Sequence, residues 1–446
     1  MFTEIRLQNF KCYRDTGRVR LRPLTLLIGP NNAGKSTLLQ AILMLKQTYE
    51  DRDVGEPLIT SGPYVDLGSF HDILRGGRRA SRATLSVSLK VSSNDTRRVQ
   101  ITENMSSLII PMADTLNVRF SFNKRRNAVV VANAELRNAE RVFIGAKRTR
   151  EGLTATDLPA QVARHVQIRL VNFLPAIRLV GRPPRSESVI RKVLDYDTYS
   201  QAQVHIWRHV FENTSHVEPL RQPVPRYNLL GQMPASELGA GGENLLRVLR
   251  NPSKVPGRKG SLLQLMDEWL SSRASAPKEL RLQNVDEEGT VQSLMASERP
   301  DSLAVNVANM GSGVSQLLPI LASAIAITAG DTVLVEQPEI HLHPAAQADL
   351  GDVFIENLGG SRQFIVETHS EHLLLRVRRR IAEGLSPDKV SVLFVERVRG
   401  EPQITEVRPD RRGHFPNWPR GFFEQGYDEA LALARAASKV KARSRR

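Results

Sequence analysis

The chain has 446 residues, of which 62 are lysine or arginine, 47 are aspartate or glutamate and one is cysteine. An apolar fraction of 41% allows a sizeable core and excludes global disorder. The net charge of +15 favours polyanions such as nucleotides and nucleic acid, although proteins that bind neither can also be basic. The single cysteine, Cys12, excludes an internal disulfide and indicates a reducing compartment.

No apolar run is long enough for a membrane-spanning helix, which needs about 20 residues. The most apolar run, residues 317–329, predicts a buried helix. The N-terminal residues alternate between apolar and polar side chains, so they do not form a signal peptide. The sequence therefore predicts a cytoplasmic protein without membrane contact.

The first predicted unit, residues 1–150, combines a nucleotide-binding pattern with a β-rich region. Residues 24–28 form a nearly continuous apolar run, which is typical of a parallel strand covered on both faces. Residues 36–49 have apolar side chains at helical spacing. Alternating stretches within residues 80–145 predict an antiparallel sheet that flanks the main sheet.

Three further units are predicted along the chain. Residues 151–300 carry short helical patterns between loops rich in Pro, Gly and Arg, which indicates a helical, loop-rich insertion. Residues 301–400 return to alternating helix and apolar strand, as expected of a second ATPase lobe, and residues 401–446 form a C-terminal extension with a basic tail. The helical patterns of the insertion lie at residues 160–170, 188–193, 243–249 and 262–270.

The most specific motif is Gly-Pro-Asn-Asn-Ala-Gly-Lys-Ser at residues 29–36, which matches the G-x-x-x-x-G-K-[ST] pattern of a phosphate-binding loop. Backbone N–H groups of such a loop surround the β-phosphate of a nucleotide. Lys35 is expected to bridge the β- and γ-phosphates, and Ser36 to place its hydroxyl on Mg²⁺. The residues predicted to contact the nucleotide here are Gly29, Pro30, Asn31, Asn32, Ala33, Gly34, Lys35, Ser36 and Thr37.

The second half of the predicted site lies almost 300 residues downstream. Residues 332–336 form an apolar strand that ends in Glu336, a Walker B arrangement in which the carboxylate orients water on Mg²⁺. The sequence Gly-Ser-Gly-Val-Ser-Gln precedes this strand at residues 311–316. A further apolar strand, residues 364–366, leads into Glu-Thr-His-Ser, which contains His369.

The order of these motifs resembles that of SMC-like ABC ATPases, in particular the OLD-like AAA group. The guanine-recognition pattern N-K-x-D is absent from the sequence. Residues 418–425, Trp-Pro-Arg-Gly-Phe-Phe-Glu-Gln, also resemble a small extension on one uncharacterised branch of that group. The resemblance covers residues 1–50 and 300–430 and implies an α/β fold: an ABC-type P-loop ATPase head with a flanking antiparallel sheet.

The resemblance also implies roles for residues outside the phosphate loop. Ser312 and Gly313 would cap the γ-phosphate of an ATP held by a partner copy, so each site would be complete only in a homodimer or a higher even-numbered oligomer. His369 would sense the γ-phosphate, and Ser36 with Glu336 would hold Mg²⁺. The expected cofactors are therefore ATP and Mg²⁺.

One departure from the family pattern and one absent motif affect the expected chemistry. Gln337 occupies the position of the glutamate that normally polarises the attacking water, and an amide cannot act as a base. Glu339, two residues on, is the candidate substitute, and slow hydrolysis is predicted. No D-x-D motif follows Glu396, so we expect no Toprim nuclease, and any cleavage of nucleic acid would require a separate effector or nuclease protein.

The leading functional hypothesis is an ATP-gated sensor or regulator in a multi-protein complex, most commonly a bacterial anti-phage defence system. A RecF-like DNA-repair ATPase is one alternative, and a non-hydrolysing, ATP-dependent scaffold is the other, which Gln337 makes credible. The basic tail, residues 439–446, fits either direct contact with DNA or a solvated terminus.

Overall fold

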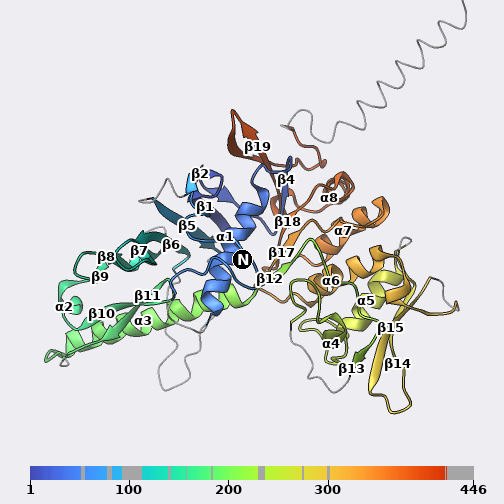
Figure 1. Cartoon of the computed structure of the whole chain (residues 1–446), viewed down its shortest axis with the longest axis horizontal. Coiled ribbons are helices and arrows are strands. Elements are labelled where there is room, and N and C mark those ends of the chain that lie inside the picture. The colour runs from blue at the N-terminus through green and yellow to red at the C-terminus, as the bar shows by residue number, and fades with distance from the viewer. Residues whose placement is uncertain are drawn as a thin grey trace, which may run out of the picture.

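The computed structural model describes residues 1–51, 56–77, 83–92, 113–138, 142–156, 158–181, 184–229, 237–273, 276–298, 302–416 and 418. A mainly parallel sheet lies between an antiparallel sheet on one side and a smaller sheet on the other (Figure 1). The predicted α/β class with a flanking antiparallel sheet is confirmed. The predicted basic tail and all but Trp418 of the 418–425 motif lie outside the described residues.

The central sheet joins the two predicted halves of the nucleotide site. Its strand order is β12-β17-β18-β4-β19-β20, with all neighbours parallel except β19 and β20. Strand β4 lies between β18 and β19, which follow it by more than 300 residues, and the fully buried side chains of β4 and β18 suit this central position. The strands are β4 Leu24–Ile28, β12 Thr214–Val217, β17 Thr332–Glu336, β18 Gln363–Glu367, β19 Val390–Val398 and β20 Glu401–Val407.

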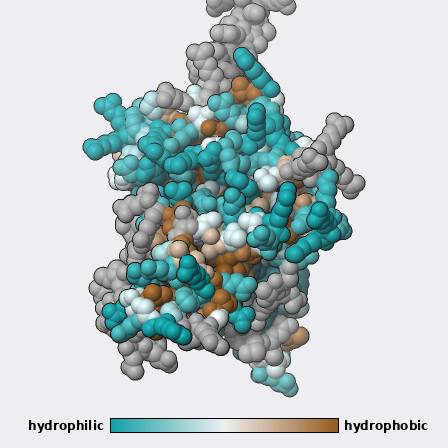
Figure 2. Space-filling model, turned by 90° about the vertical axis from the view of Figure 1, so that its left-hand side faces the viewer, coloured by the Kyte–Doolittle hydropathy of each residue, from teal (hydrophilic) through white to brown (hydrophobic). Residues whose placement is uncertain are grey.

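The antiparallel sheet has the order β2-β1-β5-β6-β7-β8-β9, and β3 pairs with β1. Strand β5 alternates between partly and fully buried side chains, because only one of its faces packs on the core. Figure 2 shows that this end of the molecule is mostly hydrophilic, with a hydrophobic area in its lower half. The strands are β1 Phe2–Phe10, β2 Tyr13–Asp15, β3 Val19–Arg20, β5 Thr84–Val91, β6 Thr115–Asn123, β7 Ala128–Arg137, β8 Val142–Arg148 and β9 Leu153–Thr156.

The remaining strands form a hairpin, β10 with β11, and a small sheet in which β15 pairs with β13, β14 and β16. These strands are β10 Val166–Val171, β11 Leu174–Leu179, β13 Asn228–Leu229, β14 Glu279–Asn284, β15 Val291–Ser297 and β16 Val305–Asn306. The α-helices of the described residues are α1 Lys35–Glu50, α2 Ala160–Ala163, α3 Glu187–Glu212, α4 Leu245–Leu249, α5 Leu262–Ser271, α6 Ser312–Ala326, α7 Pro344–Glu356 and α8 Glu371–Ala382.

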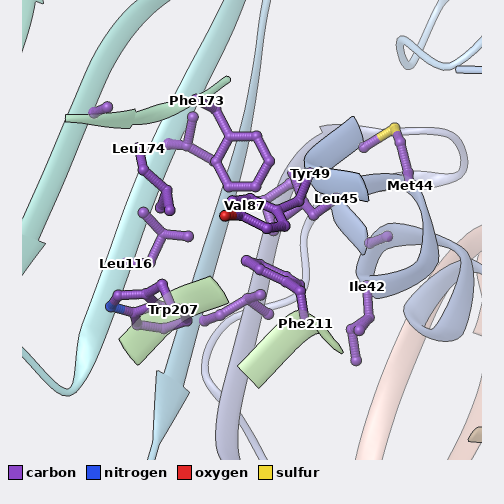
Figure 3. Packing of buried hydrophobic residues seen from close by; sticks show 14 of the residues in the cluster. Ile42, Met44, Leu45, Tyr49, Val87, Leu116, Phe173, Leu174, Trp207 and Phe211 are labelled. Carbon is purple, nitrogen blue, oxygen red and sulfur yellow. The ribbon is translucent and has the colours of Figure 1, made fainter. Parts of the chain in front are cut away.

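The helix that leaves the phosphate loop is anchored by an aromatic core. Helix α1 packs against α3 and the antiparallel sheet (Figure 3). The ring of Tyr49 stacks on that of Phe211 with 5.8 Å between centroids, and Phe173 meets Phe211 edge-on at 5.7 Å. Trp207 is fully buried beside them. This packing fixes the far end of α1, so the loop at its start is built on a rigid element.

The stretch from 151 to 300 differs from its expected helical character. The predicted helix at residues 160–170 is wrong, because α2 ends at Ala163 and β10 begins at Val166. Val166 and Ile168 are buried on one face of the β10–β11 hairpin, so strand pairing prevails over helical spacing. The described parts of this stretch contribute strands to four different sheets, and the boundaries at 150, 300 and 400 remain predictions.

The predicted buried helix in the most apolar run is confirmed, since α6 buries almost every side chain from Ser315 to Ile325. Within the described residues, no helix has both the length and the apolar character needed to cross a bilayer.

Candidate nucleotide-binding site

The phosphate loop is a tight turn that leaves β4 and starts α1. Gly29 and Gly34 have φ values of 140° and 113°, a region that L side chains rarely adopt. A Cβ atom would lie 2.0 Å from the carbonyl oxygen of Val395 at Gly29, and 2.7 Å from the sulfur of Cys12 at Gly34. Both glycines are therefore required. Because Gly34 is also the N-cap, it offers no side chain to the free N–H groups of α1.

Lys35 lies in the centre of the site and is only 3% exposed. Its Nζ donates to the carbonyl oxygens of Gly29, at 3.1 Å, and Pro30, at 2.8 Å. It also lies 3.9 Å from Oε1 of Glu367. Burial lowers the pKa of Lys35, while the carboxylates of Glu367 and Glu339 oppose that shift. A buried cation is thus held at the mouth of the loop, where a phosphate group would meet it.

Two carboxylates face the loop from the carboxyl ends of neighbouring strands. Glu336 on β17 and Glu367 on β18 are register partners. Oε1 of Glu336 lies 2.9 Å from Nε2 of His216, and Glu367 accepts a hydrogen bond from Ser36. Oε2 of Glu367 is buried and has no hydrogen-bond partner among the described residues. This set of carboxylate and hydroxyl oxygens, with one orphaned oxygen, fits Mg²⁺.

The carboxylate of Glu367 lies in an unfavourable electrostatic environment. Burial raises its pKa from 4.5 to about 6, and the charge of Glu336 adds to the shift, while the hydrogen bond from Ser36 and the charge of Lys35 oppose it. Protonated Glu367 therefore contributes to the free energy of unfolding. This contribution is fully present below pH 4.5 and is lost as the pH rises through about 6.

We expect Glu367→Gln to raise the stability of the nucleotide-free protein at pH 7.5 by about 1–2 kcal/mol, because a neutral amide replaces a desolvated carboxylate. At pH 4.5, where folded wild-type protein already carries the proton, the gain should nearly vanish. Thermal unfolding of both proteins at the two pH values measures this difference. An equal gain at both pH values, or a loss at pH 7.5, would contradict the electrostatic explanation.

The loop after Glu336 is braced against the segment that contains His369. Gln337 has φ = 43°, and its N–H donates to the carbonyl oxygen of Glu367 at 2.8 Å. The carboxylate of Glu339 accepts from Thr368 Oγ1 at 2.8 Å and from the backbone N–H of His369 at 2.6 Å. Both oxygens of Glu339 are therefore engaged, and burial raises its pKa despite these hydrogen bonds.

His369 presents a neutral, unpaired imidazole to the site. Burial, aided by the charge of Lys35, lowers its pKa. Its Nε2 is buried without a hydrogen-bond partner among the described residues. A free ring nitrogen of this kind is able to bond a phosphate oxygen, and the γ-phosphate role of His369 stays a prediction.

The predicted signature residues lie elsewhere. Ser312 is exposed at the start of α6, and a Cβ atom on Gly313 would lie 3.1 Å from the carbonyl oxygen of His341. None of the hydrogen bonds of the described residues joins Ser312 or Gly313 to residues 29–37. The structure thus brings together the phosphate loop, Glu336, Gln337, Glu339 and His369, and leaves the signature on the surface.

Sequence reasoning missed three members of this region. His216 reaches Glu336 from β12, and Arg221 lies buried just beyond that strand. The four residues of β12 are too few for a clear alternation, so the sequence contained no usable signal for His216. Glu367 was visible at the end of an apolar strand but was given no role.

Three protein-family models match the chain. Residues 1–156 match the model described as "AAA ATPase domain", and residues 192–376 match "AAA domain, putative AbiEii toxin, Type IV TA system". Residues 385–433, which include the predicted 418–425 motif, match "Protein of unknown function (DUF3696)". No curated protein sequence matches the chain.

Solved structures that resemble the chain include heads of SMC proteins. One is an SMC head bound to the C-winged helix domain of ScpA, with 13% identity, a TM-score of 0.45 and coverage of 91% of this chain and 98% of that chain. The SMC head domain from Thermotoga maritima has 14% identity, a TM-score of 0.39 and coverage of 91% and 98%. An SMC head from Pyrococcus furiosus, with an extended coiled coil and bound to the C-terminal domain of ScpA, has 11% identity, a TM-score of 0.39 and coverage of 91% and 96%.

Proposed function

We propose that this chain, an ABC-type AAA ATPase by its family matches and motif order, binds ATP with Mg²⁺ and hydrolyses it slowly in a closed homodimer. One observation carries the proposal. The buried cation of Lys35 lies beside the carboxylate of Glu367, whose register partner is Glu336, at the carboxyl edge of one sheet. Open α/β sheets bind ligands at this edge.

Each residue of the site has a role that its position supports. The loop from Gly29 to Thr37 would surround the phosphates, with Lys35 on the β- and γ-phosphates. Ser36 and Glu336 would hold Mg²⁺, which supplies charge neutralisation on the phosphate oxygens when bound. The free Nε2 of His369 would bond the γ-phosphate, and Ser312 with Gly313 would complete the site of a partner copy.

Slow hydrolysis follows from the groups that flank the proposed water position. Gln337 can orient a water molecule but cannot accept its proton. Glu339 is committed to Thr368 and the backbone of His369, so it serves as a brace rather than a free base. The geometry therefore favours a nucleotide-gated switch, in which bound ATP persists long enough to signal.

We expect Gln337→Glu to raise the single-turnover rate of ATP hydrolysis by about tenfold or more, since it restores a carboxylate at the water position. Gln337→Ala, the matched control, should not raise it. Rapid-quench measurement of ADP formation from pre-bound ATP separates this chemical step from nucleotide exchange. A fast wild-type rate that Gln337→Glu leaves unchanged would contradict the assignment, and no turnover in either protein would favour a pure scaffold.

We further propose that the switch acts in the cytoplasm with a separate effector or nuclease, in bacterial anti-phage defence. The description of one matched family names a toxin of a type IV toxin–antitoxin system, and this supports a role in defence. The net charge of +15 favours contact with DNA and keeps a repair ATPase as the second candidate. Stimulation of hydrolysis by a co-expressed neighbouring protein would favour defence, whereas stimulation by DNA alone would favour repair.

A further inference from the structure

Arg221 lies at the junction between the signature helix and the loop that follows Glu336. Its side chain is charged yet only 4% exposed. A buried guanidinium is costly unless it is hydrogen-bonded, so its partners show what it holds together. Besides the nearby carbonyl oxygen of Glu218, to which Nη1 of Arg221 donates at 3.3 Å, those partners come from two elements that the proposed reaction cycle uses at different sites.

The first element is helix α6. The Nε of Arg221 donates to Oε1 of Gln316 at 3.1 Å, and Nε2 of Gln316 donates back to the backbone carbonyl oxygen of Arg221 at 2.9 Å. Gln316 lies four residues after Ser312, which is one helical turn. The reciprocal pair therefore fixes the turn of α6 that presents Ser312 at the surface.

The second element is the loop at residues 337–341. One Nη of Arg221 donates to the carbonyl oxygens of Pro338, at 3.4 Å, and Ile340, at 3.5 Å. Its charge also acts on Glu339, which holds Thr368 and His369 in place. The loop has positive φ values at Gln337 and His341, so its conformation depends on such external support.

Burial lowers the pKa of Arg221 to about 10, with the charge of Glu339 opposing the shift, and Arg221 therefore stays cationic at neutral pH. A lysine at this position could keep the charge, but it could not bond α6 and the loop at once, because it lacks the planar fork of donors. The contact is specific to arginine.

We infer that Arg221 is a positioning residue that couples the hydrolytic loop of its own subunit to the signature turn that this subunit offers to its partner. The inference rests on the proposed function. It predicts that movement of the loop on ATP binding shifts Ser312 through the rigid Arg221–Gln316 pair, so that the two sites of a dimer act together.

The first test separates binding from turnover. We expect Arg221→Met to lower kcat by about tenfold or more while the Kd for Mg–ATP changes less than about twofold, because the phosphate loop is untouched. Gln316→Met removes only the contact with α6, and it should likewise lower kcat while leaving the Kd nearly unchanged. Arg221→Lys should recover little of the kcat that Arg221→Met loses. If Arg221→Met fails to fold, the Gln316→Met and Arg221→Lys proteins provide the same comparison. A kcat within about twofold of wild type in these folded variants would overturn the inference.

The second test uses a mixed dimer with one intact site. A Lys35→Ala subunit supplies the signature, and a Ser312→Arg subunit supplies the phosphate loop. Coupling predicts that Arg221→Met lowers turnover when placed in either subunit, because it links both elements. Loss of turnover in only one of the two placements would show that Arg221 acts locally and does not couple the two elements. Failure of the wild-type protein to bind ATP or dimerise would instead contradict the proposed function, so the two failures are distinguishable.

Discussion

The Lys35→Ala protein is expected to lose ATP binding and to hydrolyse ATP at least about a hundredfold more slowly than wild type, since a preorganised charge facing the phosphates is removed. The Nζ of Lys35 donates to the loop carbonyls of Gly29 and Pro30, which hold the ammonium at the loop and leave one of its three N–H groups for a phosphate. Equilibrium titration with a fluorescent ATP analogue and a steady-state assay measure the two effects.

Lys46 provides the matched control, because it is another buried lysine of α1. Its Nζ donates to the carbonyl oxygen of Phe211 and pairs with Glu50, away from the phosphate loop. We expect Lys46→Ala to lower the thermal midpoint while the affinity for ATP stays near that of wild type. Equal loss of binding in both variants would show general damage to α1 and would contradict a specific role for Lys35.

The Ser312→Arg protein is expected to bind ATP with wild-type affinity and yet to lose nearly all turnover. Ser312 is exposed and shares no hydrogen bond with the phosphate loop of its own chain, so its substitution leaves nucleotide binding intact. A long cationic side chain at the start of α6 would prevent a partner's site from closing over it. Nucleotide titration and steady-state hydrolysis on the same sample separate the two outcomes.

Mixing the two inactive variants provides the decisive control for this prediction. In a dimer of Lys35→Ala and Ser312→Arg subunits, one composite site has both intact parts. Random assembly at equal concentrations should restore up to about a quarter of the wild-type activity, because half of the dimers are mixed and each has one site with both intact parts. Full activity of Ser312→Arg alone, or no recovery on mixing, would contradict the composite site.

Local sequence was enough to place the phosphate loop and the Walker B strand. The loop from Gly29 to Ser36 needs a strand before it and a helix after it, and both have clear apolar patterns in the sequence. The strand that ends at Glu336 has the apolar run Val-Leu-Val at residues 333–335, and the burial of that run follows directly. These features depend on neighbours in the chain, which is why they could be predicted.

The contacts of His216 and Arg221 could not be predicted, because they depend on neighbours in space. His216 lies on a four-residue edge strand, and its partner Glu336 is 120 residues away. Arg221 bonds Gln316 and carbonyl groups of a loop, across separations of 95 residues or more. A short polar segment contains no periodicity that would reveal such partners.

The region around Val166 shows a second limit. The spacing of four between Val166 and Leu170 fits a helical stripe, whereas the alternation of Val166, Ile168 and Leu170 fits a strand. The choice depends on whether a partner strand is present. The pairing of β10 with β11 stabilises the strand rather than a helix. Short apolar patterns of this kind are resolved only by tertiary packing.

The mass of the protein in solution, measured by light scattering with Mg²⁺ and a non-hydrolysable ATP analogue, tests the composite site most directly. We predict that the wild-type protein doubles its mass on adding the nucleotide, while the Lys35→Ala protein does not change. A wild-type protein that binds the analogue, hydrolyses ATP and remains a monomer of 49.8 kDa would contradict the proposal that two copies share each site.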